Sequence, residues 1–405
     1  MLALRVARIF DGRSLTRDAG VVFVEGDRIV GVESSGYDIP SGCEILDRPD
    51  GTLLPGLIDA HVHLVGDSGP GALERLPGFS PDDLSRTIEQ SLRVQLATGV
   101  TTVRDLGDKA WSVVDWRARP HAGLPTVLAS GPPITSRGGH CSTMGGEVTG
   151  VDELRAAVRE RAERGADIVK IMASGGMTTP GTAVDQGQFT AEELAAVVAE
   201  ADVAGLPVTA HAHALISIRD AIAAGVDGIE HCTFLTADSV YVPDDAIAAL
   251  AAQGIVVCPT IGRAPDAVPP PHLLERLLKA GMDLESRARQ VAHAHRAGVT
   301  IISGTDGGIN PGKPHGILPR AIADLVAGGM APADALASAT STAADACGLG
   351  DRKGHVRVDY DADLIVVDGD PLSDISALLR LDSTILAGEV LTSAGDDGTA
   401  VRPEE

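Results

Sequence analysis

The feature that most constrains the fold is a regular alternation between residues 57 and 347 of short apolar runs with longer stretches of helical character. Eight runs predict buried strands: Leu57–His63, Thr101–Leu106, Thr126–Gly131, Ile168–Ser174, Pro207–His213, Gly228–Thr233, Gly254–Thr260 and Thr300–Asp306. The intervening stretches space apolar residues as helices do, for example Asp152–Arg164, Ala191–Ala204, Ser217–Ala224, Asp244–Ala252 and Leu273–Ala297. Strands that alternate with helices pair in parallel. Eight such units predict an α/β fold, specifically a closed (β/α)8 TIM barrel.

The two chain ends have a different pattern. The stretch Val21–Val32 resembles two short strands joined by a turn at Gly26-Asp27, and Ala362–Asp368 is again strand-like. We therefore predict a small β-sandwich domain that combines residues 1–55 with residues 348–395, beside a barrel of residues 56–347. The polar residues 396–405 are expected to fray as a tail.

Composition narrows the functional class. The formal charge is −23 and no basic run occurs, which argues against a nucleic-acid partner. No stretch has the ~18 consecutive apolar residues of a membrane-spanning helix. The five cysteines are widely spaced and form no CxxC pair, which favours a reducing compartment. These features favour a cytoplasmic protein. Separately, we expect a homo-oligomer that acts on a small molecule.

Histidine, lysine and aspartate residues stand where the predicted strands end. His61 and His63 are two apart in a strand, so their imidazoles point to the same face. Such a pair is a common beginning of a transition-metal site. Because barrel enzymes carry their chemistry at the carboxyl ends of the strands, residues from later strands can join this pair. The candidates are Lys170, His211, His231 and Asp306.

Lys170 lies within the apolar run Ile168–Met172. Burial disfavours a charged ammonium and lowers the lysine pKa toward the neutral amine. A neutral amine can react with CO2 to give a carbamate, an anionic ligand with two oxygens that can bridge two cations. The alternative is an unmodified lysine that pairs with an acid or extends to solvent at the strand end.

Four segments carry a family resemblance: Leu53–His63, Ile229–His231, Ser303–Asp306 and Asp361–Val367. They resemble the amidohydrolase superfamily, in particular its imidazolonepropionase-like and prolidase-like (Xaa-Pro dipeptidase-type) branch. The resemblance implies a centre of two divalent cations, usually zinc. It assigns His61, His63 and Asp306 to one cation and His211 and His231 to the other, with carboxylated Lys170 as the bridge.

The same resemblance implies a metal-dependent hydrolase. A hydroxide that bridges the cations would attack a carbonyl, and Asp306 would act as general base and then as general acid toward the leaving amine. We expect cleavage of an amide or peptide C–N bond in a dipeptide or an N-acyl amino acid.

Further residues are candidates for substrate contact. Arg104, at the end of the second strand, could bind a carboxylate or form a structural ion pair with Asp105. His140 follows two glycines after the third strand, and prolidase-like enzymes place such a histidine near the substrate carbonyl. Gly175 is expected to shape the pocket, and Tyr241 is a further candidate for substrate contact.

His213 shares its strand face with His211, so spacing alone leaves the metal ligand of the fifth strand open. Three other readings stay open as well. One is a mononuclear enzyme that opens a cyclic amide or deaminates a heterocycle with Lys170 unmodified. Another is an esterase or lactonase with the same site, and the third is a non-catalytic scaffold. The sequence does not define the substrate side chain, the native metal or the size of the oligomer.

Overall fold

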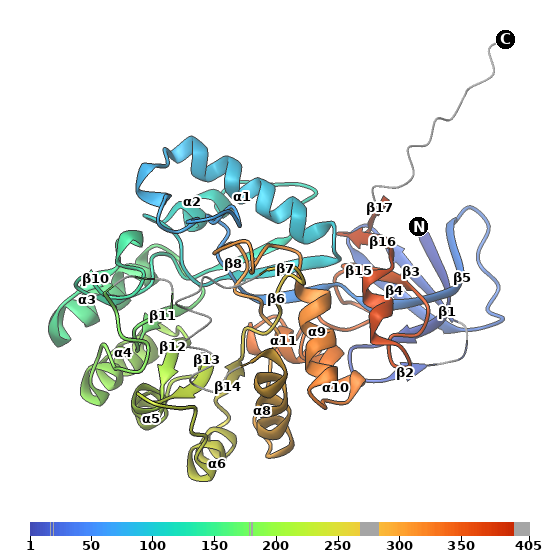
Figure 1. The fold of residues 1–405 in the computed structure, drawn as a ribbon. Coiled ribbons are helices and arrows are strands. Elements are labelled where there is room, and N and C mark those ends of the chain that lie inside the picture. Colours follow the sequence, from blue (N-terminus) through green and yellow to red (C-terminus); the bar gives the residue numbers. More distant parts are fainter. Residues whose placement is uncertain (17, 19, 178, 180, 268–282, 393–405) are drawn as a thin grey trace.

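The computed structural model describes residues 1–392 except 17, 19, 178, 180 and 268–282. Parallel strands lie at its centre and helices surround them (Figure 1). The central strands are β6 (Leu57–Val62), β7 (Val100–Asp105), β8 (Thr126–Ala129), β11 (Val169–Met172), β12 (Val208–Ala214), β13 (Gly228–Leu235) and β14 (Val256–Cys258). The helices are α1 (Pro81–Leu96), α2 (Ser112–Arg117), α3 (Gly150–Glu163), α4 (Ala191–Ala204), α5 (Leu215–Ala224), α6 (Asp244–Gln253), α8 (Leu284–Arg296), α9 (Leu318–Ala327), α10 (Pro332–Ala337) and α11 (Ser341–Ala346).

Short elements complete the central part of the chain. The described residues include the 3-10 turns η1 (Leu76–Gly78) and η2 (Ser142–Met144), and a further one, η3 (Ile375–Leu379), lies nearer the C-terminus. The strands β9 (Thr135–Ser136) and β10 (Glu147–Val148) pair with each other and frame the loop that carries His140. The predicted helix Leu273–Ala297 lies partly outside the described residues, and its described portion is α8.

The central strands form two parallel sheets, ordered β6-β7-β8 and β11-β12-β13-β14. Single bridges connect them: Ile134 pairs with Ile171 of β11, and Val257 of β14 pairs with Ile301. A third bridge joins Val62 of β6 to Gly307. The order of strands and connections is that of the α/β fold predicted from the alternating pattern.

The last predicted strand, Thr300–Asp306, differs from the expectation. It forms a single bridge, between Ile301 and Val257, rather than a ladder, because other partners take its backbone groups. The amide of Ser303 donates to the carbonyl of Ser338, and the amide of Thr305 donates to the carboxylate of Asp59. The segment still lies beside β6, since the amide of Asp306 donates to the carbonyl of His61 at 2.8 Å.

Local sequence explains the helix and strand boundaries. Every residue of β12 is buried, as expected for a parallel strand covered on both faces. Helix α4 begins with a capping box in which Thr190 accepts from the amide of Glu193 and Glu193 accepts from the amide of Thr190. It ends at Gly205, whose φ of 69° is a left-handed conformation that costs glycine little. The predicted range Ala191–Ala204 is confirmed.

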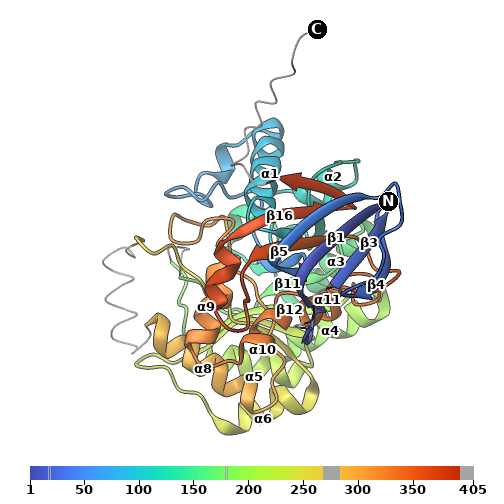
Figure 2. The ribbon, with the colours of Figure 1, turned by 90° about the vertical axis from the view of Figure 1, so that its right-hand side faces the viewer.

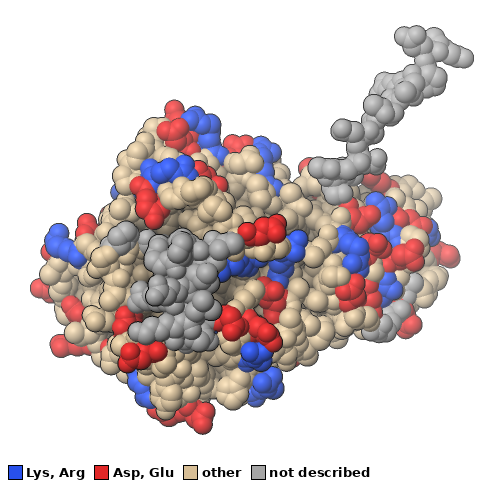
Figure 3. Space-filling model, in the orientation of Figure 1, with Lys and Arg blue, Asp and Glu red and all other residues tan. Residues whose placement is uncertain are grey.

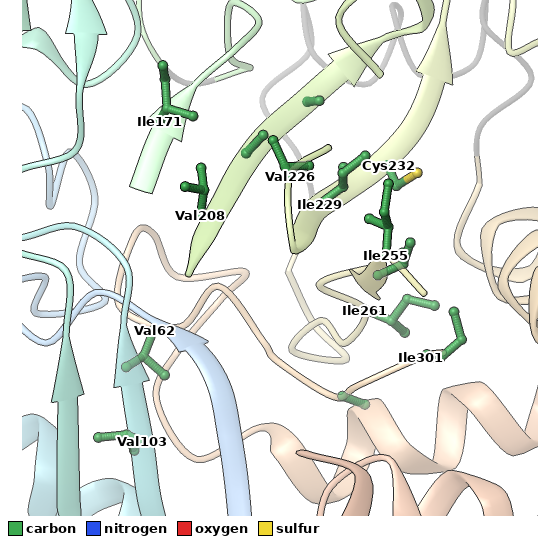
Figure 4. Packing of buried hydrophobic residues seen from close by; sticks show 14 of the residues in the cluster. Val62, Val103, Ile171, Val208, Val226, Ile229, Cys232, Ile255, Ile261 and Ile301 are labelled. Atoms are coloured by element: carbon green, nitrogen blue, oxygen red, sulfur yellow. The ribbon is translucent and has the colours of Figure 1, made fainter. Parts of the chain in front are cut away.

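The main core lies between the central strands and the helices. Figure 4 shows Val62 and Val103 from one sheet and Ile171, Val208 and Ile229 from the other in this layer. Aromatic residues make up only 2% of the chain, so valine, isoleucine, leucine and alanine supply most of the buried surface. Close packing of these residues fixes the strand ends from which the polar site projects.

Both chain ends contribute to one further sheet of eight strands, which faces the viewer in Figure 2. Its path is β17-β16-β15-β5-β1-β3-β4, and β2 pairs with β1. The bounds are β1 (Leu2–Phe10), β2 (Leu15–Thr16), β3 (Gly20–Glu25), β4 (Arg28–Ser34), β5 (Glu44–Pro55), β15 (Leu364–Asp368), β16 (Leu381–Leu386) and β17 (Glu389–Thr392). Because β5 leads directly into β6, this sheet anchors the first site strand. The predicted tail 396–405 lies outside the described residues.

Charge is spread over the surface. On the face shown in Figure 3, acidic and basic side chains alternate over the described residues without a broad basic area. Among the described helices, none has the length and hydropathy needed to cross a bilayer.

Candidate metal centre

The residues expected to bind metal line one cavity of about 370 Å³ at the carboxyl ends of the central strands. The strand ends of a (β/α)8-type sheet are where barrel enzymes carry their sites. The predicted residues that line this cavity are His61, His63, His140, Lys170, His211, His213, His231 and Asp306. The sequence separates some of them by more than 200 positions, and the fold brings them together.

One cluster consists of His61, His63 and Asp306, whose ligand-type atoms lie within 4.8 Å of one another. Asp306 Oδ1 is 3.4 Å from His61 Nε2 and 3.2 Å from His63 Nε2. The His63 Nδ1 atom lies 2.9 Å from the carbonyl oxygen of Gly107, which leaves Nε2 to face Asp306. The donor set, two imidazoles and a carboxylate, suits a borderline divalent cation such as zinc.

A buried carboxylate holds His61 from behind. His61 Nδ1 lies 2.7 Å from Glu230 Oε2, and Glu230 Oε1 accepts hydrogen bonds from Thr209 Oγ1 at 2.7 Å and from Arg104 Nη2 at 3.3 Å. Burial would raise the pKa of Glu230, but the neighbouring His61, Lys170 and Arg104 lower it overall. An ionised Glu230 keeps the Nδ1 proton on His61 and directs Nε2 toward the cavity.

The electrostatics of this cluster favour neutral imidazole at His61 and ionised Asp306. Burial, with a smaller contribution from Lys170, lowers the pKa of His61 to about 4. For Asp306, burial would raise the pKa, but the hydrogen bond from His63 and the positive charges nearby, that of Lys313 among them, lower it overall. Neutral imidazole and ionised carboxylate are the protonation states that bind metal.

A second cluster consists of His211, His213 and His231, again with ligand-type atoms within 4.8 Å of one another. Neutral groups hold these rings: His213 Nδ1 lies 2.9 Å from Thr233 Oγ1, and His231 Nδ1 lies 2.8 Å from Thr260 Oγ1. His211 instead places Nε2 3.2 Å from the carbonyl oxygen of Gly175. Burial is the largest influence on all three and lowers each pKa, that of His213 to about 3.

The structure therefore brings both histidines of β12 to the second cluster. The rings of His211 and His213 lie 4.5 and 4.4 Å from that of His231. The choice between them, which the sequence left open, stays a prediction.

Lys170 projects from β11 into the same cavity and is 1% exposed. Its Nζ atom makes no hydrogen bond within the described residues. Burial lowers its pKa, against the opposing charges of Glu230 and Asp306. A buried amine without a hydrogen-bond partner is costly, and this one lies among side chains of the types that bind metal.

Strained backbone places several of these side chains. His231, Thr260 and Asp306 have φ angles of 64°, 48° and 60°, in the left-handed region that non-glycine residues rarely adopt. Each such conformation costs on the order of 1–3 kcal/mol and persists only where surrounding contacts impose it. The turns direct side chains at the strand ends toward the cavity.

His140 closes one side of the cavity. Its Nδ1 atom lies 2.7 Å from Thr179 Oγ1, and its ring centroid is 4.5 Å from that of His211. A Cβ atom at Gly176 would lie 2.2 Å from the His140 ring, so only glycine leaves room for it. Gly175, which the sequence predicted to shape the pocket, contacts His211 through its carbonyl oxygen.

Of the predicted substrate-binding residues, three are not among the described residues that line the cavity: Arg104, Gly175 and Tyr241. Arg104 is buried below the site, where it pairs with Glu230 and donates from Nε to the carbonyl of Ala60 at 2.8 Å. This placement favours the structural ion pair over carboxylate binding, although the partner is Glu230 rather than Asp105. Tyr241 is 58% exposed and is not among the lining residues, because it lies on the loop that follows β13.

Sequence reasoning missed several residues of the site. Glu230 precedes the predicted ligand His231 but carried no motif of its own. Thr233 in β13 and Thr260 after β14 contact histidines through hydroxyl groups, which no sequence motif marked. Three cations also line the cavity: Arg263, Arg287 and Lys313. No spacing rule identified them, because they come from loops and from α8 rather than from strand ends.

Taken together, a parallel α/β fold with two histidine-rich clusters at its strand ends defines a metal-dependent hydrolase class. The model of the amidohydrolase family matches residues 52–391. The chain belongs to this family, which confirms the resemblance found in the sequence.

Three relatives illustrate the similarity. The ochratoxinase of Aspergillus niger is 29% identical over 403 residues, which cover 90% of this chain and 80% of the relative. The imidazolonepropionase of Cereibacter sphaeroides is 28% identical over 401 residues, 92% of this chain and 94% of the relative. A crystal structure of a Xaa-Pro dipeptidase with methionine bound in its active site is 29% identical, covers 96% of this chain and 99% of its own, and superposes with a TM-score of 0.84. The last match supports the expected barrel with its accompanying β domain.

Proposed function

We propose that this protein is a hydrolase with two divalent cations, most simply zinc, that cleaves an amide or peptide C–N bond in a small substrate with a free carboxylate. His61, His63 and Asp306 would hold one cation, and His211 and His231 the other. Carboxylated Lys170 would bridge the two cations.

The observation that carries this proposal is the meeting of two donor clusters and one unpartnered amine in a single cavity. Each cluster has the donor types of a zinc site. A carbamate on Lys170 Nζ would give that atom the polar contacts that it lacks. Two cations bound there would polarise a substrate carbonyl and lower the pKa of a water molecule toward neutrality.

The residues of the chain would supply the remaining chemistry. Asp306, whose pKa is lowered and which contacts His63, would accept a proton from the attacking water and deliver it to the leaving amine. His140 would donate a hydrogen bond toward the scissile carbonyl from the opposite side of the cavity. His213 would contact the substrate beside His211.

The substrate class is proposed from the relatives and from the shape of the site. The Xaa-Pro dipeptidase relative binds methionine, an amino acid with a free carboxylate, in its active site. A cavity of about 370 Å³ accommodates a molecule of dipeptide size. Dipeptides and N-acyl amino acids are therefore the first candidates.

We also propose the wider organisation of the molecule from the sequence. The central strands would close into an eight-stranded barrel of residues 56–347. Residues 1–55 and 348–395 would form the accompanying β-sandwich, in a homo-oligomeric enzyme.

A substrate panel tests the proposal. The zinc-loaded protein would be assayed with Xaa-Pro and other dipeptides, N-acetyl amino acids, matched esters and lactones, and imidazolone-type cyclic amides. We expect hydrolysis of at least one acyclic amide, loss of that activity on chelation, and recovery with Zn²⁺. Turnover confined to esters, or confined to cyclic amides or heterocyclic amines, would contradict the proposal in favour of the other readings of the sequence.

A further inference from the structure

The cavity carries more positive charge than its metal chemistry requires. Apart from Lys170, three cationic residues line it: Arg263, Arg287 and Lys313. The carboxylates among the described lining residues are Asp306, which belongs to the metal cluster, and Asp283, which caps α8 through a hydrogen bond from the amide of Ser286. None of the three cations forms an ion pair of 4.0 Å or less with a carboxylate of the described chain.

Arg287 already has partners. Its guanidinium donates to the carbonyls of His231 and Cys232 and to the side chain of Gln290. These bonds stabilise the left-handed turn at His231. Arg287 is therefore a structural support for the second cluster, and it is the other two cations whose role is unassigned.

Arg263 and Lys313 are brought together by two loops. Arg263 follows β14 and Lys313 follows the Thr300–Asp306 segment, and the amide of Ala264 donates to the carbonyl of Gly312 at 3.1 Å. A Cβ atom built on Gly312 would lie 3.4 Å from Arg263 Nε, so the guanidinium packs beside the residue that precedes Lys313. Two like charges held this close repel each other, and the repulsion grows as water is excluded.

Lys313 has donor capacity left. Its Nζ atom donates to the carbonyl of Thr260 at 2.5 Å, which uses one of its three hydrogen atoms. This bond fixes the ammonium next to the loop that also holds His231 through Thr260 Oγ1. The ammonium therefore stands at the edge of the metal centre, on the same chain segment as Asp306.

We propose that Arg263 and Lys313 form the subsite that binds the free carboxylate of the substrate, in place of the buried Arg104. Two adjacent cations with unused donors match a carboxylate, whose two oxygens can each accept a charge-assisted hydrogen bond. The anion would relieve the repulsion between the cations and fix the scissile bond at the metal centre. This inference rests on the proposed function, because it names the recognition of that same substrate.

Ligand binding without turnover tests the subsite. L-methionine carries the carboxylate, and L-methioninol has the same side chain and amino group without it. Calorimetry on the zinc-loaded protein should show tighter binding of methionine. Lys313→Met and Arg263→Gln should each weaken methionine binding roughly ten- to hundredfold, the size expected for loss of a hydrogen bond to a charged group, and leave methioninol unchanged.

A matched control is Lys109→Met. Lys109 is also half-buried and donates to a backbone carbonyl, that of Leu76 at 2.6 Å, but it does not line the cavity. This variant should keep the preference for methionine. Metal content and melting temperature of each variant would show that its fold and metal centre are intact.

The outcomes separate the subsite from the proposed function. The carboxylate subsite is contradicted if Lys313→Met weakens the binding of methionine and of methioninol equally. It is also contradicted if this variant weakens the binding of neither compound. Failure of the unsubstituted protein to bind methionine more tightly than methioninol contradicts it too. The proposed function fails separately, when the unsubstituted protein hydrolyses no acyclic amide of the substrate panel.

Discussion

The two histidine clusters of the metal centre are held by different kinds of partner. In the first, His61 and His63 contact the carboxylate of Asp306, and the carboxylate of Glu230 holds His61 from behind. In the second, His213 and His231 are held by threonine hydroxyls and His211 by a backbone carbonyl. One half of the site is built with negative charge and the other with neutral groups.

This difference predicts that the binding of the two cations depends unequally on Lys170. A cation in the first cluster has an anionic ligand from the chain itself. A cation in the second cluster meets only neutral imidazoles, so its charge is balanced only if Lys170 carries a carbamate. We therefore expect the second cation to be the one that depends on the modification.

The largest effect is expected for Lys170→Ala. Removing the bridge should lower kcat/KM by roughly 10³-fold or more, because the contribution of a metal ion amounts to several kcal/mol. Bound zinc should fall from two ions per chain to one. Acetate or propionate should restore part of the activity by occupying the vacated position.

Lys109→Ala is the control for this experiment, since Lys109 lies outside the cavity. Full activity of Lys170→Ala, with two ions retained, would show that the amine takes no part in metal binding.

The next largest effect should separate the two histidines of β12. His211→Asn is expected to weaken the binding of the second cation by more than roughly 100-fold. Loss of a residue that only supports a metal ligand has a smaller effect. His213→Asn should change metal affinity by less than about tenfold and act mainly on KM. Competition with a chelating dye measures the metal affinity of each variant. A larger loss of metal affinity in His213→Asn than in His211→Asn would make His213 the ligand.

Glu230→Gln tests the charged half. Loss of the carboxylate should weaken the binding of the first cation by about 10- to 100-fold. The change also leaves Arg104 buried without its counter-charge, and breaking a buried pair costs on the order of 3–5 kcal/mol of unfolding free energy.

The double variant Glu230→Gln with Arg104→Met should recover much of the stability but none of the metal affinity. Denaturant unfolding and dye competition measure the two quantities separately. Recovery of both together would mean that Glu230 serves the fold and not the metal site.

The smallest effect is expected for Thr260→Val, which removes the neutral partner of His231 at nearly constant volume. A neutral hydrogen bond contributes about 0.5–1.5 kcal/mol, so the binding of the second cation should weaken by roughly three- to tenfold. An effect as large as that of Glu230→Gln would remove the distinction between the two halves.

The sequence predicted the parts of the molecule that depend on periodicity. The apolar runs predicted the bounds of β6, β7 and β12 to within one residue at each end. The helical spacing of apolar residues in 191–204 predicted the bounds of α4. The HxH spacing and the strand-end positions identified residues that line one cavity in the structure. These features are local, so the chain can encode them without reference to distant segments.

Features that depend on long-range contacts could not be read in this way. The segment Thr300–Asp306 lacks a ladder because Asp59, almost 250 positions earlier, takes the amide of Thr305. Arg104 lies near the end of a strand, where barrel enzymes carry substrate-binding residues, but it is buried below the cavity and its guanidinium pairs with Glu230. Arg263 and Lys313 meet only when two loops close on each other.

The most direct test of the account is the zinc content of the purified protein with and without bicarbonate. Plasma emission spectrometry should find two ions per chain in bicarbonate buffer. After exhaustive dialysis against CO2-free buffer it should find one ion per chain. The Glu230→Gln variant should bind that remaining ion more weakly. A single ion per chain under both conditions, or two ions that ignore the removal of CO2, would contradict a bridge built on Lys170.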